Sequence, residues 1–373
     1  MRVGLPRMHK EAGEHRDFLP TFVEALCRDG AEEVVLEDGY GAGIDVEPEE
    51  YLSIAPSVRF APYREIFDQD AVVVVRCPDE TSIGWMRPGS ILVTMLHFPT
   101  RPGRVRLLHD ARLEALSLDS VRDDTGRRLV ENLEAVGWNG VEAAFREIAQ
   151  IHPHFAHPSR RPLRVTCLGA GAVGGHAVRA ATRYGDIRLR EEMVANNVPG
   201  VEVTVVDFDL TWHEDYMLGR LERTDLLIDA TSRLDTSVPV IPNGWIAALP
   251  EDAVVLDLSS DPYLPEADPP MVKGIEGVPH GDLDRYVFSV DDPAWESQPV
   301  TVATTNRRLA LSCYAWPGIH PRRCMEVYGF QIEPLMTLIL STPISEWDEQ
   351  SGRHDVRAAG RGALARWRTT ADR

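Results

Sequence analysis

The sequence has no long hydrophobic run, few cysteines and no excess of basic residues. No apolar stretch in the 373-residue chain approaches the length of a membrane span, and Met1–Leu5 has the pattern of a strand and not of a signal peptide. The five cysteines form no Cys-x-x-Cys pair, which is typical of a reducing compartment where cysteines act as small hydrophobic side chains. We therefore expect a cytoplasmic protein that does not contact a membrane.

Acidic residues outnumber basic ones, with 58 Asp and Glu against 39 Lys and Arg and a net charge of −19. A balance of this sign argues against nucleic acid and anionic membranes as partners. Hydrophobic residues make up 43% of the chain and charged residues 26%, which is the usual composition of a soluble globular protein. A chain of this length has room for two domains that each bury a core.

The most informative motif is Gly-Ala-Gly-Ala-Val-Gly at residues 169–174, between the apolar run Leu163–Leu168 and a helical pattern over Val173–Tyr184. A strand that leads into Gly-x-Gly-x-x-Gly and then a helix is the fingerprint of dinucleotide binding. Its glycines permit a tight turn, close approach of the backbone to a pyrophosphate and close packing of helix on strand. The start of the helix offers unpaired N–H groups and a positive dipole end to the phosphates. The cofactor contacts predicted here are Gly169, Gly171, Ala172, Val173 and Gly174.

A second apolar strand, Val201–Val206, leads directly to Asp207. An acid at this position can accept hydrogen bonds from the ribose hydroxyls of a dinucleotide. Asp209 follows, and no arginine beside the pair could neutralise a 2′-phosphate, so we expect NAD as the cofactor. Asp207 lies 33 residues after Gly174 instead of roughly 20, and we interpret residues 186–200 as an excursion after the helix. The alternative is an ordinary α/β turn followed by a surface acid.

Apolar strand patterns alternate with helical patterns along the chain, which predicts parallel sheets covered by helices on both faces. Before the fingerprint the expected strands are Met1–Leu5, Glu33–Leu36, Ala71–Arg76, Ser90–Leu96 and Glu114–Leu118. After it they are Val201–Val206, Leu226–Ala230, Val254–Leu258 and Leu309–Tyr314. The other main helices expected are Pro20–Asp29, Leu129–Gln150, Cys324–Leu340 and Val356–Trp367.

We therefore expect an α/β fold of two Rossmann-like domains, with parallel sheets and a cleft between the domains. Residues 1–150 would form the first part of a substrate domain, and residues 160–314 an NAD-binding domain. Residues 151–162 are rich in Pro, His and Arg, and indicate a linker. Residues 315–373 would return to the first domain, because their helices have no strands of their own to cover.

Several segments together resemble the alanine dehydrogenases and the nucleotide-binding subunit of pyridine nucleotide transhydrogenase. The likeness covers most of residues 1–340. Its segments are residues 1–6, 14–20, 73–78, 92–97, 169–174 with Asp207, 256–261 and 315–321. Saccharopine dehydrogenases of the lysine-forming type share this architecture. The resemblance implies a substrate domain that precedes an NAD domain and is completed by the C-terminal segment.

The resemblance implies roles for four side chains. Arg16 matches the arginine that binds the substrate carboxylate, a task to which a planar guanidinium is suited. His97 would relay the proton that accompanies hydride transfer, and Asp261 would lie beside the nicotinamide. Arg76 stands where the family has a lysine, so the positive charge is kept but a neutral base is lost. The alternatives are structural: a surface arginine, a paired histidine and an aspartate that caps a turn.

These residues predict an NAD-dependent oxidoreductase that transfers hydride at an amine-bearing carbon, between an amino acid and an imine or 2-oxo acid. The substrate would be a small molecule that carries a carboxylate. Two alternatives stay open: an opine- or saccharopine-type dehydrogenase that joins a 2-oxo acid to a larger amine, and a non-catalytic NAD-binding protein. The remaining cofactor contacts that we expect are Thr231 and Trp316.

Two further expectations concern assembly and metals. The resembling enzymes range from monomers to hexamers, so a homo-oligomer is open but not required. No metal is expected, because His152, His154 and His157 lie among prolines and lack the spacing of metal ligands.

Overall fold

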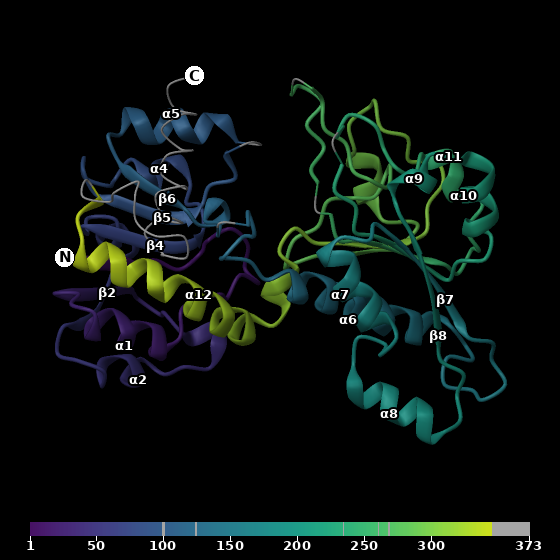
Figure 1. Cartoon of the computed structure of the whole chain (residues 1–373), viewed down its shortest axis with the longest axis horizontal. Coiled ribbons are helices and arrows are strands. Elements are labelled where there is room, and N and C mark those ends of the chain that lie inside the picture. Colours follow the sequence, from purple (N-terminus) through teal and green to yellow (C-terminus); the bar gives the residue numbers. More distant parts are fainter. Residues whose placement is uncertain (99–100, 124, 234, 260, 268, 345–373) are drawn as a thin grey trace. The chain divides into compact units, whose positions relative to one another are not determined.

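The computed structural model describes residues 1–98, 101–123, 125–233, 235–259, 261–267 and 269–344. Two compact units divide the chain (Figure 1). Unit 1 consists of Met1–Asn132 together with the described residues from His320 onward, and unit 2 consists of Leu133–Ile319. The chain therefore enters unit 2 once and returns to unit 1 once.

Unit 1 is built on a parallel sheet of six strands in the order β3-β2-β1-β4-β5-β6. The strands are β1 (Arg2–Leu5), β2 (Glu33–Glu37), β3 (Val58–Ala61), β4 (Ala71–Arg76), β5 (Ile91–Met95) and β6 (Glu114–Ser117). The helices are α1 (Pro20–Arg28), η1 (Ala42–Ile44), α2 (Pro48–Leu52), α3 (Tyr63–Ile66), α4 (Glu80–Ile83), α5 (Pro102–Asp110), η3 (Leu118–Ser120) and α12 (Pro321–Ser341). This strand order reverses direction between β1 and β4, as in doubly wound folds.

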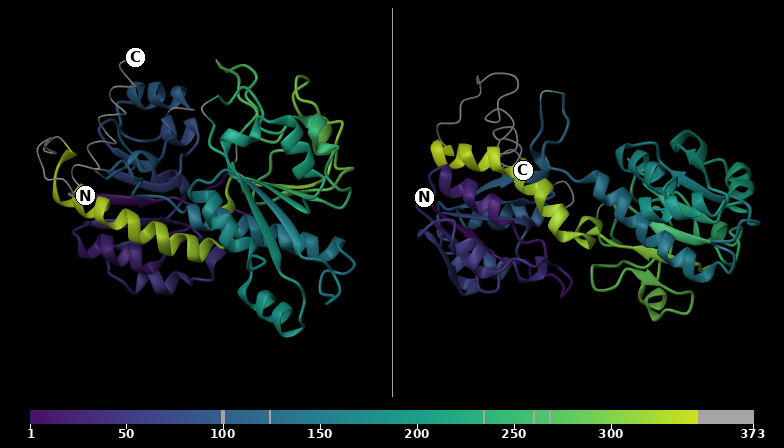
Figure 2. Two further views of the ribbon diagram at one scale, coloured as in Figure 1. Left: turned by 45° about the vertical axis from the view of Figure 1, so that its right-hand side comes forward. Right: turned by 90° about the horizontal axis from the view of Figure 1, so that it is seen from below.

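The strands of unit 1 are apolar because helices cover both faces of the sheet. In β4 the first five residues are buried, and only Arg76 at the end is partly exposed. On one face α1 and α12 pack side by side (Figure 2), and Ile332 of α12 joins the core beneath them. On the other face, Ile83 and Leu108 belong to a second cluster of buried hydrophobic side chains. Within the described residues, α12 forms the C-terminal return to unit 1, and the expected helix Val356–Trp367 lies outside them.

Unit 2 has a second six-stranded sheet in the order β11-β12-β10-β9-β7-β8. All neighbours are parallel except β11 and β12, which pair antiparallel. The strands are β7 (Leu163–Leu168), β8 (Val201–Val206), β9 (Leu226–Asp229), β10 (Val254–Asp257), β11 (Val287–Phe288) and β12 (Leu309–Ser312). The helices are α6 (Leu133–Ile151), α7 (Ala172–Ala181), α8 (Ile187–Ala195), α9 (Phe208–Thr211), α10 (Glu214–Leu221), α11 (Asn243–Ile246), η4 (Pro293–Ser297) and η5 (Trp316–Ile319).

The predicted α/β class with two Rossmann-like sheets is confirmed. One helix differs from the expectation, because α6 belongs to unit 2 and not to the first domain. Gly137 explains the contact: a Cβ at this position would lie 2.8 Å from the backbone nitrogen of Ala177, so its absence lets α6 approach α7 closely. The excursion over residues 186–200 contains α8. Among the described residues, no helix is long and apolar enough to span a membrane.

Candidate active site

A pocket of about 740 Å³ lies in unit 2, where β7, β8 and β9 end. β7 pairs with β8 on one side and with β9 on the other, so the connections leave in opposite directions and open a crevice at the carboxyl ends of the strands. The volume is that of a small-molecule or cofactor site. Its walls include Gly169, Ala170, Gly171, Asp207, Phe208, Trp212, Thr231 and Arg233.

Two glycines of the fingerprint are required by close contacts, and the third leaves the backbone open. Gly169 has a φ of +92°, and a Cβ there would lie 2.7 Å from the carbonyl oxygen of Ala230. At Gly174 a Cβ would lie 2.1 Å from the carbonyl oxygen of Gly169, so this glycine sets the contact between α7 and the β7 turn. Gly171 faces open space and has no side chain to cap α7. The free N–H groups and the open backbone fit a pyrophosphate.

The acid after β8 lies on the pocket wall, as a ribose-binding group must. Asp207 is exposed, and its Oδ1 accepts a hydrogen bond from the N–H of Phe208 at 2.9 Å. Phe208 and Trp212 line the same wall and are 79% and 72% exposed. Of the residues that the fingerprint predicts, Gly169, Gly171 and Asp207 therefore line one pocket.

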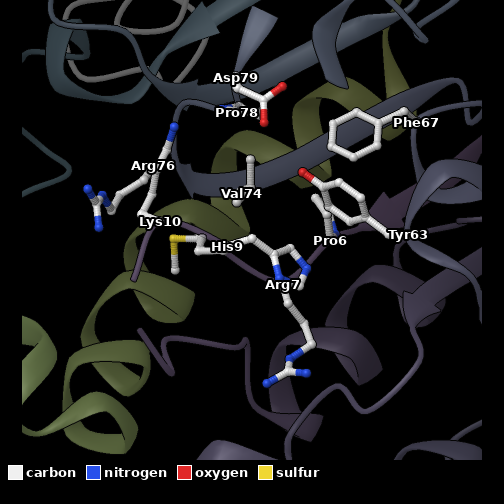
Figure 3. A pocket seen from close by; sticks show the side chains of 11 residues that line it. Pro6, Arg7, His9, Lys10, Tyr63, Phe67, Val74, Arg76, Pro78 and Asp79 are labelled. Carbon is white, nitrogen blue, oxygen red and sulfur yellow. The ribbon is translucent and has the colours of Figure 1, made fainter. Parts of the chain in front are cut away.

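Unit 1 has a small pocket in the corresponding position, at the ends of β1 and β4 (Figure 3). Its volume is about 20 Å³, which is the room of about one ordered water. Lys10 and Arg76 lie next to each other there, and the amino group of Lys10 points toward Asp79 (Figure 3). Lys10 is exposed, so this strand end presents a positive charge to solvent.

Arg16 and Arg76 share the carboxylate of Glu14. Arg16 donates two hydrogen bonds to it, from Nε to Oε1 at 2.8 Å and from Nη2 to Oε2 at 2.5 Å. Arg76 donates to Glu14 at 3.0 Å and to Glu11 at 2.8 Å. Burial opposes both charges, yet the ion pair lowers the pKa of Glu14 and raises that of Arg16. Arg16 is only 6% exposed and does not line the pocket of unit 1. Its connection to the pocket runs through Glu14 to Arg76.

His97 follows β5 with a left-handed backbone, at a φ of 50°. Asp119 holds this turn, because its Oδ1 accepts hydrogen bonds from the backbone N–H groups of Leu96 at 2.9 Å and of His97 at 3.2 Å. The other carboxylate oxygen lies 3.7 Å from Nδ1 of His97. Partial burial lowers the pKa of His97 by more than Asp119 raises it. The half-exposed imidazole is therefore neutral at neutral pH and can accept a proton.

Comparison with known proteins finds a family match for the N-terminal domain and a shared fold for the chain. Residues 4–134 match the family model "Alanine dehydrogenase/PNT, N-terminal domain", in which PNT stands for pyridine nucleotide transhydrogenase. A solved structure of L-alanine dehydrogenase superposes with a TM-score of 0.72 at 17% identity, over 96% of this chain and 94% of the other. Residues 4–134 therefore carry the N-terminal domain of this family, and the chain shares the fold of L-alanine dehydrogenase. The transhydrogenase of Sinorhizobium meliloti has the same fold, with a TM-score of 0.61 at 15% identity, over 91% and 94% of the two chains.

Sequence identity to the curated alanine dehydrogenases is low. Alanine dehydrogenase of Bacillus subtilis is 26% identical over 198 residues, which are 50% of each chain. Alanine dehydrogenase of Mycobacterium tuberculosis (strain H37Rv) is 23% identical over 274 residues, or 70% of this chain and 73% of that protein. The match to the Bacillus relative thus spans only half the length of that protein.

Five expected site residues of unit 2 are not among those that line its pocket: Ala172, Val173, Gly174, Asp261 and Trp316. Asp261 forms an ion pair with Arg233, from Oδ2 to Nη2 at 2.6 Å, and it is Arg233 that lines the pocket. Trp316 lies in the hydrophobic core, 1% exposed, and its Nε1 donates to the carbonyl oxygen of Asp257 at 2.9 Å. The core position differs from the expected contact with the nicotinamide. Its physical reason is packing, because Trp316 belongs to the hydrophobic core that α6 and β10 form in unit 2, with Val141 and Leu256.

The sequence analysis did not predict the buried polar cluster that lies beneath the pocket. Asp229, Asp257 and Ser312 end the neighbouring strands β9, β10 and β12 in register. The ammonium of Lys273 donates to Asp257 and, at 3.0 Å, to Oγ of Ser312. Asp229 accepts from the N–H of Thr231 at 3.0 Å and from its hydroxyl at 2.6 Å, which fixes Thr231 on the pocket wall.

Substitution Asp229→Asn is expected to flatten the pH dependence of stability. Burial and Asp257 raise the pKa of Asp229 from its usual 3.8 to about 6. The folded protein binds the proton of Asp229 more tightly than the unfolded chain does. Protonation therefore stabilises the fold fully at pH values below the unfolded pKa, and this stabilisation is lost as the pH rises through about 6. Asparagine cannot ionise, so the variant should have a higher Tm than the parent at pH 8 and a smaller advantage at pH 5.

Thermal unfolding between pH 5 and 8 measures this difference. Asp257 does not titrate in that range, so it does not affect the pH dependence of Tm there. Burial raises its pKa, but the charge and hydrogen bond of Lys273 lower it further, to below the usual 3.8. Asp235→Asn is a suitable control, since this exposed carboxyl has a lowered pKa. Parallel Tm curves for Asp229→Asn and the parent would contradict the assignment.

Proposed function

We propose that this protein is an NAD(H)-dependent amino-acid dehydrogenase, which transfers hydride at an amine-bearing carbon between an amino acid and an imine or 2-oxo acid. The pocket of unit 2 carries the proposal, because its open backbone at Gly171 and its acid at Asp207 suit the pyrophosphate and ribose of a dinucleotide. The match of residues 4–134 to the family model supports the oxidoreductase class, and the names of the alanine dehydrogenase relatives support an amino-acid substrate.

The residues of unit 2 would hold the cofactor without metal or covalent attachment. Gly169, Gly171 and the start of α7 would bind the pyrophosphate, and Asp207 would accept hydrogen bonds from the ribose. The negative charges of Asp207 and Asp209 disfavour binding of a 2′-phosphate. Arg233 lines the same pocket, but its positive charge is paired with the carboxylate of Asp261. These charges favour NAD over NADP. When bound, the cofactor supplies or accepts the hydride.

The residues of unit 1 would act on the substrate. Exposed Lys10, with Arg76 beside it, would offer positive charge to a carboxylate at the ends of β1 and β4. Arg16 would act indirectly, by orienting Glu14 against Arg76. Because an arginine stays protonated, the proton that accompanies hydride transfer would be exchanged at the imidazole of His97, with Asp119 orienting the ring.

The test is NADH oxidation by the purified full chain with ammonia and a panel of 2-oxo acids. We expect turnover, and we expect His97→Ala to lower kcat by about a hundredfold or more, which is typical for loss of a general acid–base group. NADH binding, measured by fluorescence, should not change, because His97 belongs to unit 1. His109→Ala is the matched control, since this histidine is exposed on α5 of the same unit. Unchanged turnover in His97→Ala would contradict the role.

One observation favours a second candidate, a non-catalytic NAD-binding protein. Both arginines expected to bind substrate are already paired with Glu14, and the pocket of unit 1 is small. Tight NADH binding without turnover would support this candidate. Larger amines such as lysine belong in the panel as well, because turnover that requires them would instead identify an opine-type dehydrogenase.

A further inference from the structure

His9 and Glu37 form a histidine–carboxylate pair at the carboxyl ends of β1 and β2 in unit 1. Nε2 of His9 lies 2.6 Å from Oε1 of Glu37, the last residue of β2. The side chain of Glu37 is only 7% exposed, and its second oxygen accepts a hydrogen bond from the backbone N–H of Arg7 at 2.7 Å. A carboxylate held in this way fixes the orientation and the tautomer of the imidazole that it contacts.

The position of the His9 ring leaves one nitrogen available. The ring packs edge to face on Tyr63 of α3, with centroids 4.7 Å apart and an angle of 78° between the planes. The side chain is 50% exposed, and among the described residues Glu37 is the only hydrogen-bond partner of the ring. When Nε2–H is donated to a carboxylate, Nδ1 carries the lone pair of the neutral imidazole. This nitrogen can therefore accept a proton from a water molecule.

His9 also lines the small pocket of unit 1, together with Lys10, Tyr63, Arg76 and Asp79 (Figure 3). The volume of about 20 Å³ has room for about one water. In an amino acid or 2-oxo acid the reacting carbon is bonded directly to the carboxylate. A substrate carboxylate bound by Lys10 would therefore place the reacting carbon beside this pocket, and a water in the pocket would lie between that carbon and His9.

The two histidines at this edge of the sheet lie on opposite sides of β4. β4 pairs with β1 on one side and with β5 on the other. His9 follows β1 and His97 follows β5, whereas Arg76 ends β4, between them in the strand order. The carboxyl ends of parallel strands meet at one edge of a sheet, so the substrate would have a histidine on each side. Since an arginine stays protonated, proton exchange falls to the histidines.

We propose that His9 is the base that activates the hydrolytic water of the reaction, and that Glu37 is its positioning residue. The inference rests on the proposed dehydrogenase activity, because oxidation of an amine-bearing carbon gives a protonated imine that water must convert to the 2-oxo acid. His97 would exchange the proton that accompanies hydride transfer, and His9 would serve the later hydrolysis. The two histidines would thus act in different steps.

The hydrolysis uses His9 once as a base and once as an acid. The water oxygen forms a bond to the imine carbon, the π pair of the C=N bond moves to nitrogen, and the proton lost by the water passes to Nδ1 of His9. His9 then returns this proton to the amine nitrogen. When the C–N bond breaks, its electron pair leaves with the nitrogen, and the O–H pair of the hydroxyl forms the C=O bond. The hydroxyl proton leaves on ammonia as ammonium, so His9 ends the cycle neutral.

Rapid mixing of the full chain with NAD⁺ and an amino acid separates this step from hydride transfer. The amino acid is the one formed from the 2-oxo acid that supports the fastest NADH oxidation. In His9→Ala we expect the first turnover of NADH to form at the parent rate, followed by a steady rate about a hundredfold lower, as is typical for loss of a general base. Added imidazole should restore part of the steady rate. His109→Ala is the control and should match the parent in both phases, because this histidine is exposed on α5.

Glu37→Gln provides a second test if His9→Ala fails to fold. It keeps the imidazole but removes the charge of its partner, so the first turnover should again be retained while the steady rate falls by less than in His9→Ala. Circular dichroism and Tm verify that each variant is folded. An unchanged steady rate in His9→Ala, or a first turnover that slows as much as the steady rate, would overturn the role in hydrolysis. A parent without turnover on any 2-oxo acid would instead contradict the dehydrogenase activity itself, and the role of His9 with it.

Discussion

Lys273→Met is expected to destabilise unit 2 by about 3–5 kcal/mol, the usual cost of removing one partner of a buried ion pair. Lys273 is fully buried, and its ammonium contacts the buried carboxylate of Asp257 and the hydroxyl of Ser312. Methionine fills similar volume, so the main loss is electrostatic. The carboxylate of Asp257 would stay buried without its counter-charge, or would take up a proton as its pKa rises.

Chemical denaturation and hydrogen exchange of β10 and β12 measure this effect. The chain offers a matched control, since its only other lysine is the exposed Lys10, and Lys10→Met should leave stability within about 0.5 kcal/mol of the parent. Adding Asp257→Asn to Lys273→Met removes the unpaired charge and should recover part of the loss. A Lys273→Met variant as stable as the parent would show that the ion pair contributes nothing to unit 2.

The parts of the fold that could be predicted are those encoded by local patterns. β4, β7 and β8 have the predicted bounds, because each is a run of apolar or β-branched residues that ends at a charged residue or a glycine. β3 was missed because Val58–Ala61 is short and includes a charged residue, and β11 because it has only two residues. The pattern of α6 predicted a helix with an apolar face, but a face does not specify which sheet it will cover.

The same division holds for the candidate site. The fingerprint glycines and Asp207 belong to one βαβ unit, so short-range spacing was enough to predict that they meet. Lys273 lies 16 residues after Asp257 in a segment without regular structure, and only tertiary packing brings the two together. The pairing of Arg76 with Glu14 spans 62 residues of sequence and was likewise not predicted. The chemistry of arginine indicated that Arg16 could bind a carboxylate. It could not indicate that this carboxylate would be the side chain of Glu14 and not that of a substrate.

Substitutions at two glycines of the fingerprint should separate cofactor binding from folding. A Cβ at Gly171 meets nothing within 4 Å, and its φ of −69° is allowed for any residue, so Gly171→Val should fold normally. The added side chain would occupy the space that a pyrophosphate needs, and we expect NADH affinity to fall at least tenfold, or about 1.4 kcal/mol. In Gly174→Ala the added carbon meets the carbonyl oxygen of Gly169 at 2.1 Å, so this variant should lose stability.

Fluorescence titration with NADH and thermal unfolding of the same samples measure the two effects. Gly175→Ala is the control, because Gly175 is exposed in α7 with no atom within 4 Å of a Cβ, and alanine there should add about 1 kcal/mol of helix stability. Its NADH affinity should equal that of the parent. Unchanged binding in Gly171→Val would mean that the dinucleotide does not approach the backbone at this turn. The pocket of unit 2 would then require a different ligand.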